Sequence, residues 1–334
     1  MSSNHRYEEA KNIFKERKFF KMICGAGNDN PDEVYKLVYI YTLAGAKGID
    51  LSANPEIVSI AKKAISDASH FCEEKKQCLG IMPFITVSVG MKGDPHIRKA
   101  MIINKKCKQC KQCISICPQN AISSDITIDS LKCIGCGRCK NICRFNAIDY
   151  YSNTKSIKQI LIKCKKAGAE HAELHASIPD DELTLNEWRL INNIFSDNFV
   201  SLCIDRSNLS NIHLSKLIKS VYGISKNRLI IQADGIPMSG GIDDFNSTLQ
   251  AIATADIINK ALTFKPIILV SGGTNSKTMK LAQMCNVEIN GVSIGSFARQ
   301  LVNDGLKNFQ DEKSRKNSIK KAKKLVKICI GDII

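Results

Sequence analysis

The sequence lacks long apolar runs. No uninterrupted hydrophobic stretch approaches the roughly eighteen residues that a membrane-spanning helix needs, and residues 1–17 mix Glu8, Glu9 and Glu16 with basic side chains around no apolar signal core. The chain has 334 residues, of which 44% are hydrophobic and 24% charged, as in ordinary globular proteins. We therefore expect a cytoplasmic protein that neither spans a membrane nor is exported.

Acidic residues are scarce relative to basic ones. The chain has 32 Asp and Glu against 48 Lys and Arg, a net charge of +16, which alone would suggest nucleic acid or another acidic partner. Half of this excess lies in residues 96–146, where Asp125 and Asp129 accompany ten basic residues: Arg98, Lys99, Lys105, Lys106, Lys108, Lys111, Lys132, Arg138, Lys140 and Arg144. Because the same segment is rich in cysteine, we expect its charge to neutralise anionic clusters in part. The remaining positive charge would offer a docking face to an acidic electron-transfer partner such as ferredoxin, and we do not expect nucleic acid as a partner.

Eight of the fifteen cysteines fall between Cys107 and Cys143. The first four follow the pattern C-x2-C-x2-C-x3-C-P, and the second four repeat it 26 residues later with Arg144 in place of Pro118. The match continues beyond the cysteines, since residues 120–122 and 146–148 both read Asn-Ala-Ile. This is an internal duplication.

The spacing is typical of ferredoxins with two [4Fe–4S] clusters. Three closely spaced cysteines wrap one cluster, while the fourth, which we expect to open a short helix, binds the other. The predicted ligands are Cys107, Cys110, Cys113 and Cys143 for one cluster, and Cys133, Cys136, Cys139 and Cys117 for the second. Structural zinc fits this pattern less well, because it needs only four ligands, usually in separated pairs.

Outside the cysteine segment, short apolar strands alternate with capped helices. Eight strands are predicted, over residues 20–24, 49–51, 84–89, 171–175, 199–203, 229–232, 266–270 and 291–294. Helices are predicted after each of them, for example from the Asn30-Pro31 start to Gly45, over 211–221 up to Gly223, and over 243–258. The order predicts a (β/α)8 TIM-like barrel, with an open doubly wound sheet as the competing fold.

The barrel is interrupted by the cysteine segment. We expect residues 1–95 to form its first part with strands one to three, residues 96–150 to form a ferredoxin-like α+β insert, and residues 151–334 to complete it with a closing C-terminal helix. The insert leaves the carboxyl end of strand three, where barrel active sites lie, so both clusters should lie over the barrel mouth.

Two groups of residues are candidates for a site at this mouth. The loops after strands seven and eight predict a phosphate or FMN site, with the backbone of Gly272, Gly273, Thr274, Gly295 and Ser296 binding the anion. The ends of the other strands present seven polar residues: Cys24, Asp50, His175, Cys203, Asp205, Arg206 and Asp234. We assign a catalytic role to none of them.

Several stretches resemble the cyanobacterial light-dependent period A family, namely residues 22–26, 41–46, 271–278 and 295–299 together with the double cysteine motif. The resemblance implies an iron–sulfur protein that conveys cellular redox state, set by photosynthetic electron flow, to the circadian clock in association with clock-input proteins.

Three functions therefore remain open. The first is a redox sensor; the second is an iron–sulfur flavoenzyme with FMN in the barrel mouth; the third is a simple electron carrier, for which the barrel would be superfluous. The resemblance favours the sensor, and enzyme activity stays undecided.

Overall fold

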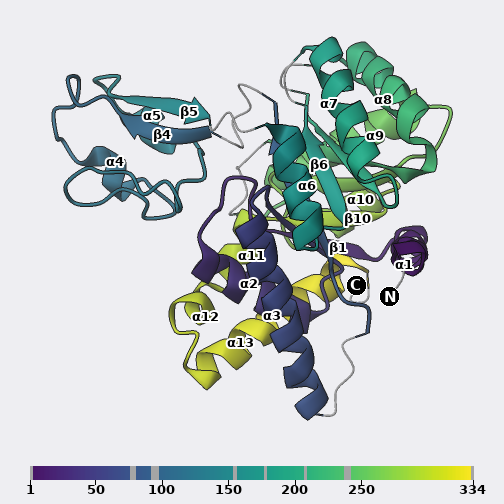
Figure 1. The fold of residues 1–334 in the computed structure, drawn as a ribbon, viewed down its shortest axis with the longest axis horizontal. Helices are drawn as coiled ribbons and strands as arrows, with labels where there is room; N and C mark the ends of the chain where they lie inside the picture. Colours follow the sequence, from purple (N-terminus) through teal and green to yellow (C-terminus); the bar gives the residue numbers. More distant parts are fainter. Residues whose placement is uncertain are drawn as a thin grey trace.

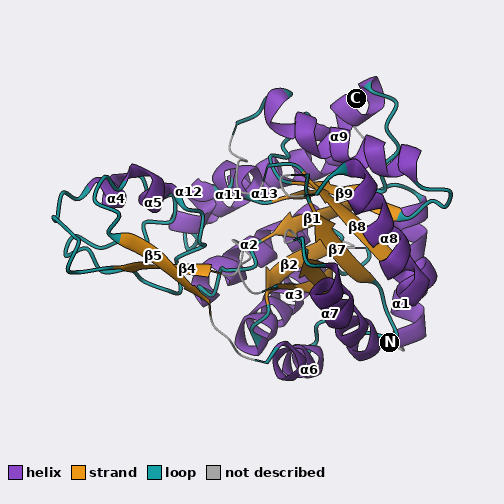
Figure 2. Cartoon of the chain, turned by 90° about the horizontal axis from the view of Figure 1, so that it is seen from above, coloured by secondary structure: helices purple, strands orange, loops and turns teal. Residues whose placement is uncertain are grey.

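Eight parallel strands close into a barrel in the order β1-β10-β9-β8-β7-β6-β3-β2 (Figure 1). The computed structural model describes residues 3–75, 80–91, 98–152, 156–176, 179–206, 209–236 and 242–331. Helices surround the barrel, and the cysteine-rich insert stands beside it (Figure 2). The predicted TIM-like barrel with an insert is confirmed, and the open sheet is excluded.

The observed barrel strands begin and end within two residues of the predicted ones. They are β1 (Phe19–Ile23), β2 (Gly48–Ser52), β3 (Phe84–Gly90), β6 (His171–His175), β7 (Val200–Ile204), β8 (Leu229–Asp234), β9 (Ile267–Ser271) and β10 (Gly291–Ile294).

The barrel helices are α1 (Ser3–Lys15), α2 (Pro31–Ala44), α3 (Pro55–Glu74), α6 (Ile157–Ala167), α7 (Asp181–Ile194), α8 (Asn211–Ser225), α9 (Asn246–Ala261), α10 (Thr278–Met284), α11 (Ser296–Leu301), α12 (Asn303–Lys307) and α13 (Glu312–Cys329), with a 3-10 turn η1 (Lys226–Arg228). Within the described ranges, no helix combines the length and apolarity that crossing a bilayer requires.

Local sequence explains most helix ends. The side chain of Asn30 accepts hydrogen bonds from the backbone N–H groups of Asp32 and Glu33, and Gly45 ends α2 at φ 91°. The predicted bounds of two helices, α8 and α9, were wrong. Helix α8 continues past Gly223 because the chain turns only at Lys226, at φ 53°. Helix α9 starts at Asn246, preceded by Asp244, whose carboxylate accepts from the N–H of Ser247.

The sequence did not predict helix α1, which closes the amino-terminal end of the barrel. Phe14 stacks on Phe19 with ring centroids 4.3 Å apart and meets the edge of Phe199 at 5.2 Å. Phe84 and Leu269 belong to the same buried cluster. With this end filled by side chains, an opening into the barrel must lie at the carboxyl ends of the strands.

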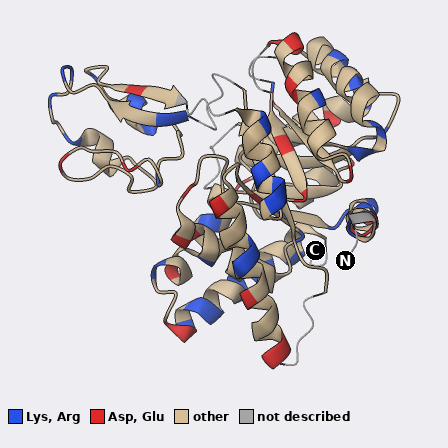
Figure 3. Cartoon of the chain, in the orientation of Figure 1, with Lys and Arg blue, Asp and Glu red and all other residues tan. Residues whose placement is uncertain are grey.

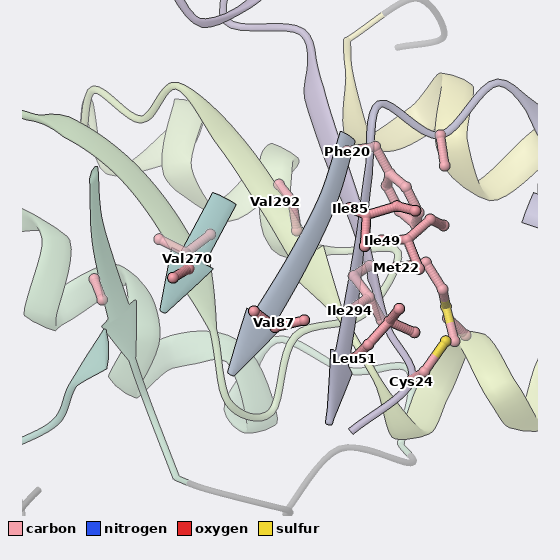
Figure 4. Close-up of a cluster of buried hydrophobic side chains, with 14 of the residues drawn as sticks. Phe20, Met22, Cys24, Ile49, Leu51, Ile85, Val87, Val270, Val292 and Ile294 are labelled. Carbon is pink, nitrogen blue, oxygen red and sulfur yellow. The ribbon is translucent and has the colours of Figure 1, made fainter. Parts of the chain in front are cut away.

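The larger hydrophobic core lies between the strands and the surrounding helices. Phe20 and Met22 of β1, and Cys24 directly after it, point into this layer (Figure 4). Residues of other barrel strands join them there: Ile49, Leu51, Ile85, Val87, Val270, Val292 and Ile294. Since side chains alternate along a strand, Lys21 and Ile23 point to the barrel interior.

The insert is built on an antiparallel pair, β4 (Arg98–Ile102) with β5 (Ile148–Ser152), in which Ala100 faces Tyr150. Between them lie two short helices, α4 (Gln112–Ser115) and α5 (Arg138–Ile142). The pair brings the two ends of the insert together, close to the expected boundaries at 95/96 and 150/151, and so leaves the barrel strands continuous on either side.

Candidate metal centre and barrel-mouth cavity

The two cysteine loops have the same backbone conformation. Positive φ angles occur at Gln109 and Lys111 in the first copy, and at Gly135 and Gly137 at the equivalent positions of the second. Asn120 and Asn146 also match, at φ 47° and 48°. The duplication seen in the sequence is therefore also a duplication of structure.

One expectation about these loops was wrong. The fourth cysteine of each copy does not open a short helix but follows one, because α4 ends at Ser115 before Cys117 and α5 ends at Ile142 before Cys143. The backbone at Cys143 is extended, with φ −78° and ψ 98°.

The eight thiols gather around two small cavities, each of about 20 Å³. One is lined by Cys107, Cys110, Cys113 and Cys143, which we call the distal set. The other is lined by Cys117, Cys133, Cys136 and Cys139, the proximal set. These are the crossed sets that the spacing predicts, and four thiols around one cavity are a donor set that suits a [4Fe–4S] cluster.

Backbone N–H groups are directed at three of the sulfurs. The N–H of Ala121 donates to Cys117 and that of Ala147 to Cys143, both with N···Sγ distances of 3.3 Å, and the N–H of Ala100 donates to Cys133 at 3.4 Å. Such hydrogen bonds stabilise thiolates and help to set cluster potentials.

The thiols also affect one another's ionisation. Burial, together with the neighbouring Cys136 and Cys133, raises the pKa of Cys139 to about 11. Burial and nearby cysteines likewise raise the pKa of Cys113 and Cys136. A bound cationic iron core removes this penalty, because ligating thiols are deprotonated by the metal.

The proximal set lies against the barrel. The ammonium of Lys99 donates to the carbonyls of Gly27 and Cys133, the latter at 2.9 Å, and pairs with Asp29 at 3.3 Å. The N–H of Asp29 also donates to the carbonyl of Leu131. The loop after β1 therefore holds the loop that carries Cys133, while the distal set faces away, with Cys110 exposed.

Figure 3 marks the positions of Lys and Arg along the chain. Not all of the ten basic residues of the insert form an open face. Lys99 binds the barrel, Arg98 stacks on Tyr150 at 3.8 Å, Lys132 pairs with Asp129, and Lys140 pairs with Asp149. Exposed basic side chains remain on the loops of the distal set, which we call the distal rim: Lys105, Lys106, Lys108, Lys111 and Arg144.

A cavity of about 110 Å³ opens at the barrel mouth. All five residues of the predicted phosphate site line it: Gly272, Gly273, Thr274, Gly295 and Ser296. Its wall also includes Ile134 of the insert, a residue that lines the proximal thiol cavity as well. One residue therefore borders both cavities. Whether the glycine loops bind an anion stays a prediction.

The structure separates the strand-end candidates into two groups. Asp50, His175, Cys203 and Asp234 line the barrel-mouth cavity. Cys24 is fully buried in the outer hydrophobic core (Figure 4), Asp205 is buried, and the guanidinium of Arg206 donates to Asn211. The last three are not among the cavity-lining residues.

Sequence reasoning missed a buried ion pair below this cavity. Lys21 and Glu173 lie 2.7 Å apart with side chains 2% and 0% exposed. The carboxylate also accepts hydrogen bonds from Ser201 at 2.9 Å and Gln232 at 2.7 Å. A charged residue at the centre of an otherwise apolar strand, as in Phe-Phe-Lys-Met-Ile, is the sequence signal that could have revealed it.

Burial alone would lower the pKa of Lys21, but Glu173 and Asp50 raise it above its usual value. Burial alone would raise the pKa of Glu173, but Lys21 and His175 lower it. Both groups are therefore charged at neutral pH.

Comparison with known proteins supports both halves of this description. The Light dependent period A C-terminal domain matches residues 163–332, and the LdpA Fe-S cluster-binding domain matches residues 105–154. Light dependent period A of Synechococcus elongatus is 28% identical over 108 residues, a match that spans 32% of this chain and 29% of that protein.

Solved structures with a similar fold include two aldolases. The YdjI aldolase of Escherichia coli K12 has a TM-score of 0.48 at 11% identity, over 97% of this chain and 94% of that one. A putative fructose-1,6-biphosphate aldolase of Coccidioides immitis has a TM-score of 0.48 at 9% identity, over 95% and 91% of the two chains. Likeness at this level carries no inference about a reaction.

The domain match over residues 163–332 covers half of the chain, and the cysteine-rich insert falls within the second match. The chain belongs to the light dependent period A family, and its insert is an iron–sulfur cluster-binding domain.

Proposed function

We propose that this protein is a redox sensor in the input pathway of the circadian clock. Two [4Fe–4S] clusters, held by the distal and proximal thiol sets, would supply one-electron oxidation and reduction. The signal would be cellular redox state, set by photosynthetic electron flow, and the recipients would be clock-input proteins, as family membership implies.

One observation carries the proposal: the two thiol sets have different surroundings. The distal set is bordered by the exposed distal rim, and the proximal set adjoins the barrel through Lys99 and Ile134. An acidic electron carrier such as ferredoxin docked on the rim would lie next to the distal thiols, at the end of the insert away from the barrel. A change of charge in the proximal set would be felt at the barrel mouth.

Pairs of cysteine substitutions test the crossed ligand sets. The wild-type chain should hold about eight iron atoms in two clusters. If Cys117 and Cys133 bind the same cluster, the double variant Cys117→Ala/Cys133→Ala should keep about four iron atoms per chain, the number also expected for each single variant. Cys117→Ala/Cys107→Ala should lose both clusters. Cys164→Ala, a buried cysteine of α6 outside both cavities, is the control.

Iron and sulfide analysis with EPR of anaerobically purified protein gives the result. If Cys117→Ala/Cys107→Ala keeps one cluster while Cys117→Ala/Cys133→Ala keeps none, each cysteine run binds its own cluster, and the crossed assignment is wrong. Wild-type protein with about four iron atoms, or with zinc in their place, would contradict two clusters.

Charge reversal tests the docking face. The triple variant Lys105→Glu/Lys108→Glu/Lys111→Glu should weaken binding to reduced or oxidised ferredoxin, while Lys320→Glu/Lys321→Glu/Lys323→Glu, with the same charge change on the exposed side of α13, should leave it nearly unchanged. One added electron about 10 Å from an acidic partner costs on the order of 1 kcal/mol, or roughly fivefold in Kd.

Oxidised protein should therefore bind acidic partners more tightly than dithionite-reduced protein, and binding should weaken from low to physiological salt. Binding that is equal in both redox states, or that the α13 variant impairs as much as the rim variant, would refute a charge-based sensor docked at the rim.

The alternative, a flavin-dependent oxidoreductase with FMN in the barrel mouth, has one observation in its favour, the closeness of that cavity to the proximal set. Its volume of about 110 Å³ is small for a three-ring flavin, because a single water already needs about 10–15 Å³. A flavin absorption spectrum after cofactor extraction, with multiple turnovers of a small substrate, would favour the enzyme over the sensor.

A further inference from the structure

Three side chains that can bind a metal ion meet inside the barrel, next to the barrel-mouth cavity. Glu173 and His175 lie on β6, and Cys203 lies on β7. The atoms with which they could bind an ion lie within 4.8 Å of one another. All three residues are buried, at 0%, 5% and 1% exposed. A carboxylate, an imidazole and a thiol are the donors with which proteins bind Zn²⁺ and similar divalent ions.

The sheet itself brings these three residues together. His175 and Cys203 are directly paired across the parallel ladder, and Glu173 lies two positions before His175 on the same strand. The residues that alternate with them, Leu174 and Leu202, belong to the outer hydrophobic core. Since side chains alternate along a strand, the three metal-binding side chains point into the barrel interior. Their grouping therefore depends on strand pairing and not on a loop.

The two oxygens of the Glu173 carboxylate have different partners. Its Oε2 accepts hydrogen bonds from the ammonium of Lys21 at 2.7 Å and from the hydroxyl of Ser201 at 2.9 Å. Its Oε1 accepts from the amide of Gln232 at 2.7 Å and lies 3.4 Å from Nε2 of His175. Because each carboxylate oxygen has two lone pairs, Oε1 can bind a metal ion while Oε2 keeps both of its donors. Such partners orient a ligating carboxylate.

The barrel-mouth cavity leaves room for a further ligand of the ion. His175 and Cys203 line this cavity, whose volume is about 110 Å³. At about 10–15 Å³ per water, it has space for several waters or for a small molecule. Structural zinc sites are closed by four protein ligands, whereas catalytic ones combine three protein ligands with an open position. Three donors beside a cavity at the carboxyl ends of the strands correspond to the open kind.

A second buried histidine on the same strand has a different environment. His171 stacks on Phe84 with ring centroids 5.1 Å apart, and its Nε2 forms a hydrogen bond with the side-chain oxygen of Asn198 at 3.0 Å. It is not among the residues that line the barrel-mouth cavity. Within the described ranges, it belongs to no group of three metal-binding side chains. His171 therefore packs the closed end of the barrel, while His175 lies with a carboxylate and a thiol at the open end.

Burial of the thiol does not prevent Cys203 from binding a metal ion. Burial, followed by the nearby Asp234 and Glu173, raises the pKa of Cys203 well above its usual value, so the thiol is neutral when no metal is bound. A divalent cation deprotonates a thiol that ligates it, and the resulting thiolate is a strong ligand for Zn²⁺. The ion itself therefore supplies the positive charge that the buried thiolate needs.

We propose that Glu173, His175 and Cys203 bind one divalent transition-metal ion of the Zn²⁺ class, with an open coordination position toward the barrel-mouth cavity. Water, or an oxygen atom of a small molecule in the cavity, occupies that position. The site is separate from both cysteine sets of the insert. It does not depend on the proposed redox-sensing function.

Zinc binding to the cluster-loaded, anaerobically purified protein tests the proposal. The chain should bind one Zn²⁺ without losing iron, and Mg²⁺, which prefers oxygen ligands, should not displace it. X-ray absorption at the zinc edge should then show one sulfur at about 2.3 Å and nitrogen or oxygen neighbours at about 2.0–2.2 Å. Four sulfur neighbours would place the zinc among the insert thiols, and no sulfur neighbour would place it away from Cys203. Either result would overturn the proposal, as would displacement by Mg²⁺ or a failure to bind Zn²⁺.

Variants of each ligand assign the site. Cys203→Ala and His175→Ala should each raise the Kd for Zn²⁺ at least about a hundredfold, because losing even an outer partner of a ligand costs about 10–100-fold. Lys21→Met/Glu173→Gln, which removes the carboxylate without leaving a buried ammonium, should raise it at least about tenfold. Cys24→Ala, at a cysteine that is equally buried but outside the cavity, is the control and should bind Zn²⁺ like the wild type. Unchanged binding in any folded ligand variant would overturn the three-ligand site. The absorption measurement needs no variant, so the proposal can be refuted even if a substitution prevents folding.

Discussion

Removing the ammonium of Lys21 should destabilise the barrel far more than removing an equally close ammonium at the surface. In Lys21→Met, Glu173 would lose its ammonium partner and keep the donors Ser201 and Gln232. The ring of His175 also stays close, with Nε2 3.4 Å from the carboxylate. Leaving one charge of a buried pair uncompensated typically costs about 3–5 kcal/mol. For a chain of this size, that corresponds to roughly 4–7 °C in Tm.

A matched control separates burial from distance. Lys260 and Asp256 are also 2.7 Å apart, but their side chains are 76% and 33% exposed. Exposed pairs contribute about 0–1 kcal/mol, so Lys260→Met should change stability by no more than that. The chain has a single tryptophan, the buried Trp188 of α7, whose fluorescence during urea unfolding reports on the barrel rather than the insert.

The double variant and the pH dependence supply the decisive readings. Lys21→Met/Glu173→Gln should recover most of the loss, because a neutral amide needs no counter-charge. In the single variant, burial without Lys21 raises the pKa of Glu173, so the destabilisation should shrink as the pH falls and the carboxyl becomes protonated. If Lys21→Met costs no more than Lys260→Met, or if the double variant is less stable than the single one, the reasoning from burial is wrong.

Three further predictions concern the barrel. Burial lowers the pKa of His171 to about 3, so the unfolded chain takes up a proton below about pH 6.5 that the folded chain does not. The free energy of unfolding should therefore fall by up to roughly 1.4 kcal/mol per pH unit as the pH drops below about 6.5. His171→Phe should flatten this slope in unfolding followed by Trp188 fluorescence, and an unchanged slope would contradict the prediction. Phe14→Ala should cost about 3–5 kcal/mol in urea unfolding because it empties the plug under the barrel, against less than about 1 kcal/mol for the exposed Phe245→Ala. Gly291→Ala should lower Tm, because its Cβ would lie 2.0 Å from the carbonyl oxygen of Phe19. Gly223→Ala on α8, where no atom lies within 4 Å of the added Cβ, should raise the free energy of unfolding by about 0.5–1 kcal/mol. Equal Tm values for the two variants would show that the close approach at Gly291 does not limit stability.

The sequence by itself determined the features that depend on local patterns. Ligand spacing predicted two cysteine sets with Cys117 and Cys143 crossed, because a cluster-binding loop needs its thiols at short fixed intervals. In the structure the members of each predicted set line one cavity. Apolar strands alternating with capped helices gave the eight-stranded barrel, because the caps and the strand periodicity are written within a few residues, as at Asn30 and Gly45.

Tertiary structure alone decided which side chains meet. Lys21 and Glu173 are 152 residues apart, and only closure of the barrel brings them to 2.7 Å. Asp50 and Asp234 face one cavity because β2 and β8 stand opposite each other in the ring, and no local pattern encodes that order. The contact of Lys99 with Gly27 selects which cysteine set lies against the barrel. These pairings depend on closure and docking of the whole chain, in which residues far apart in sequence become neighbours, so a reading of residues in chain order could not supply them.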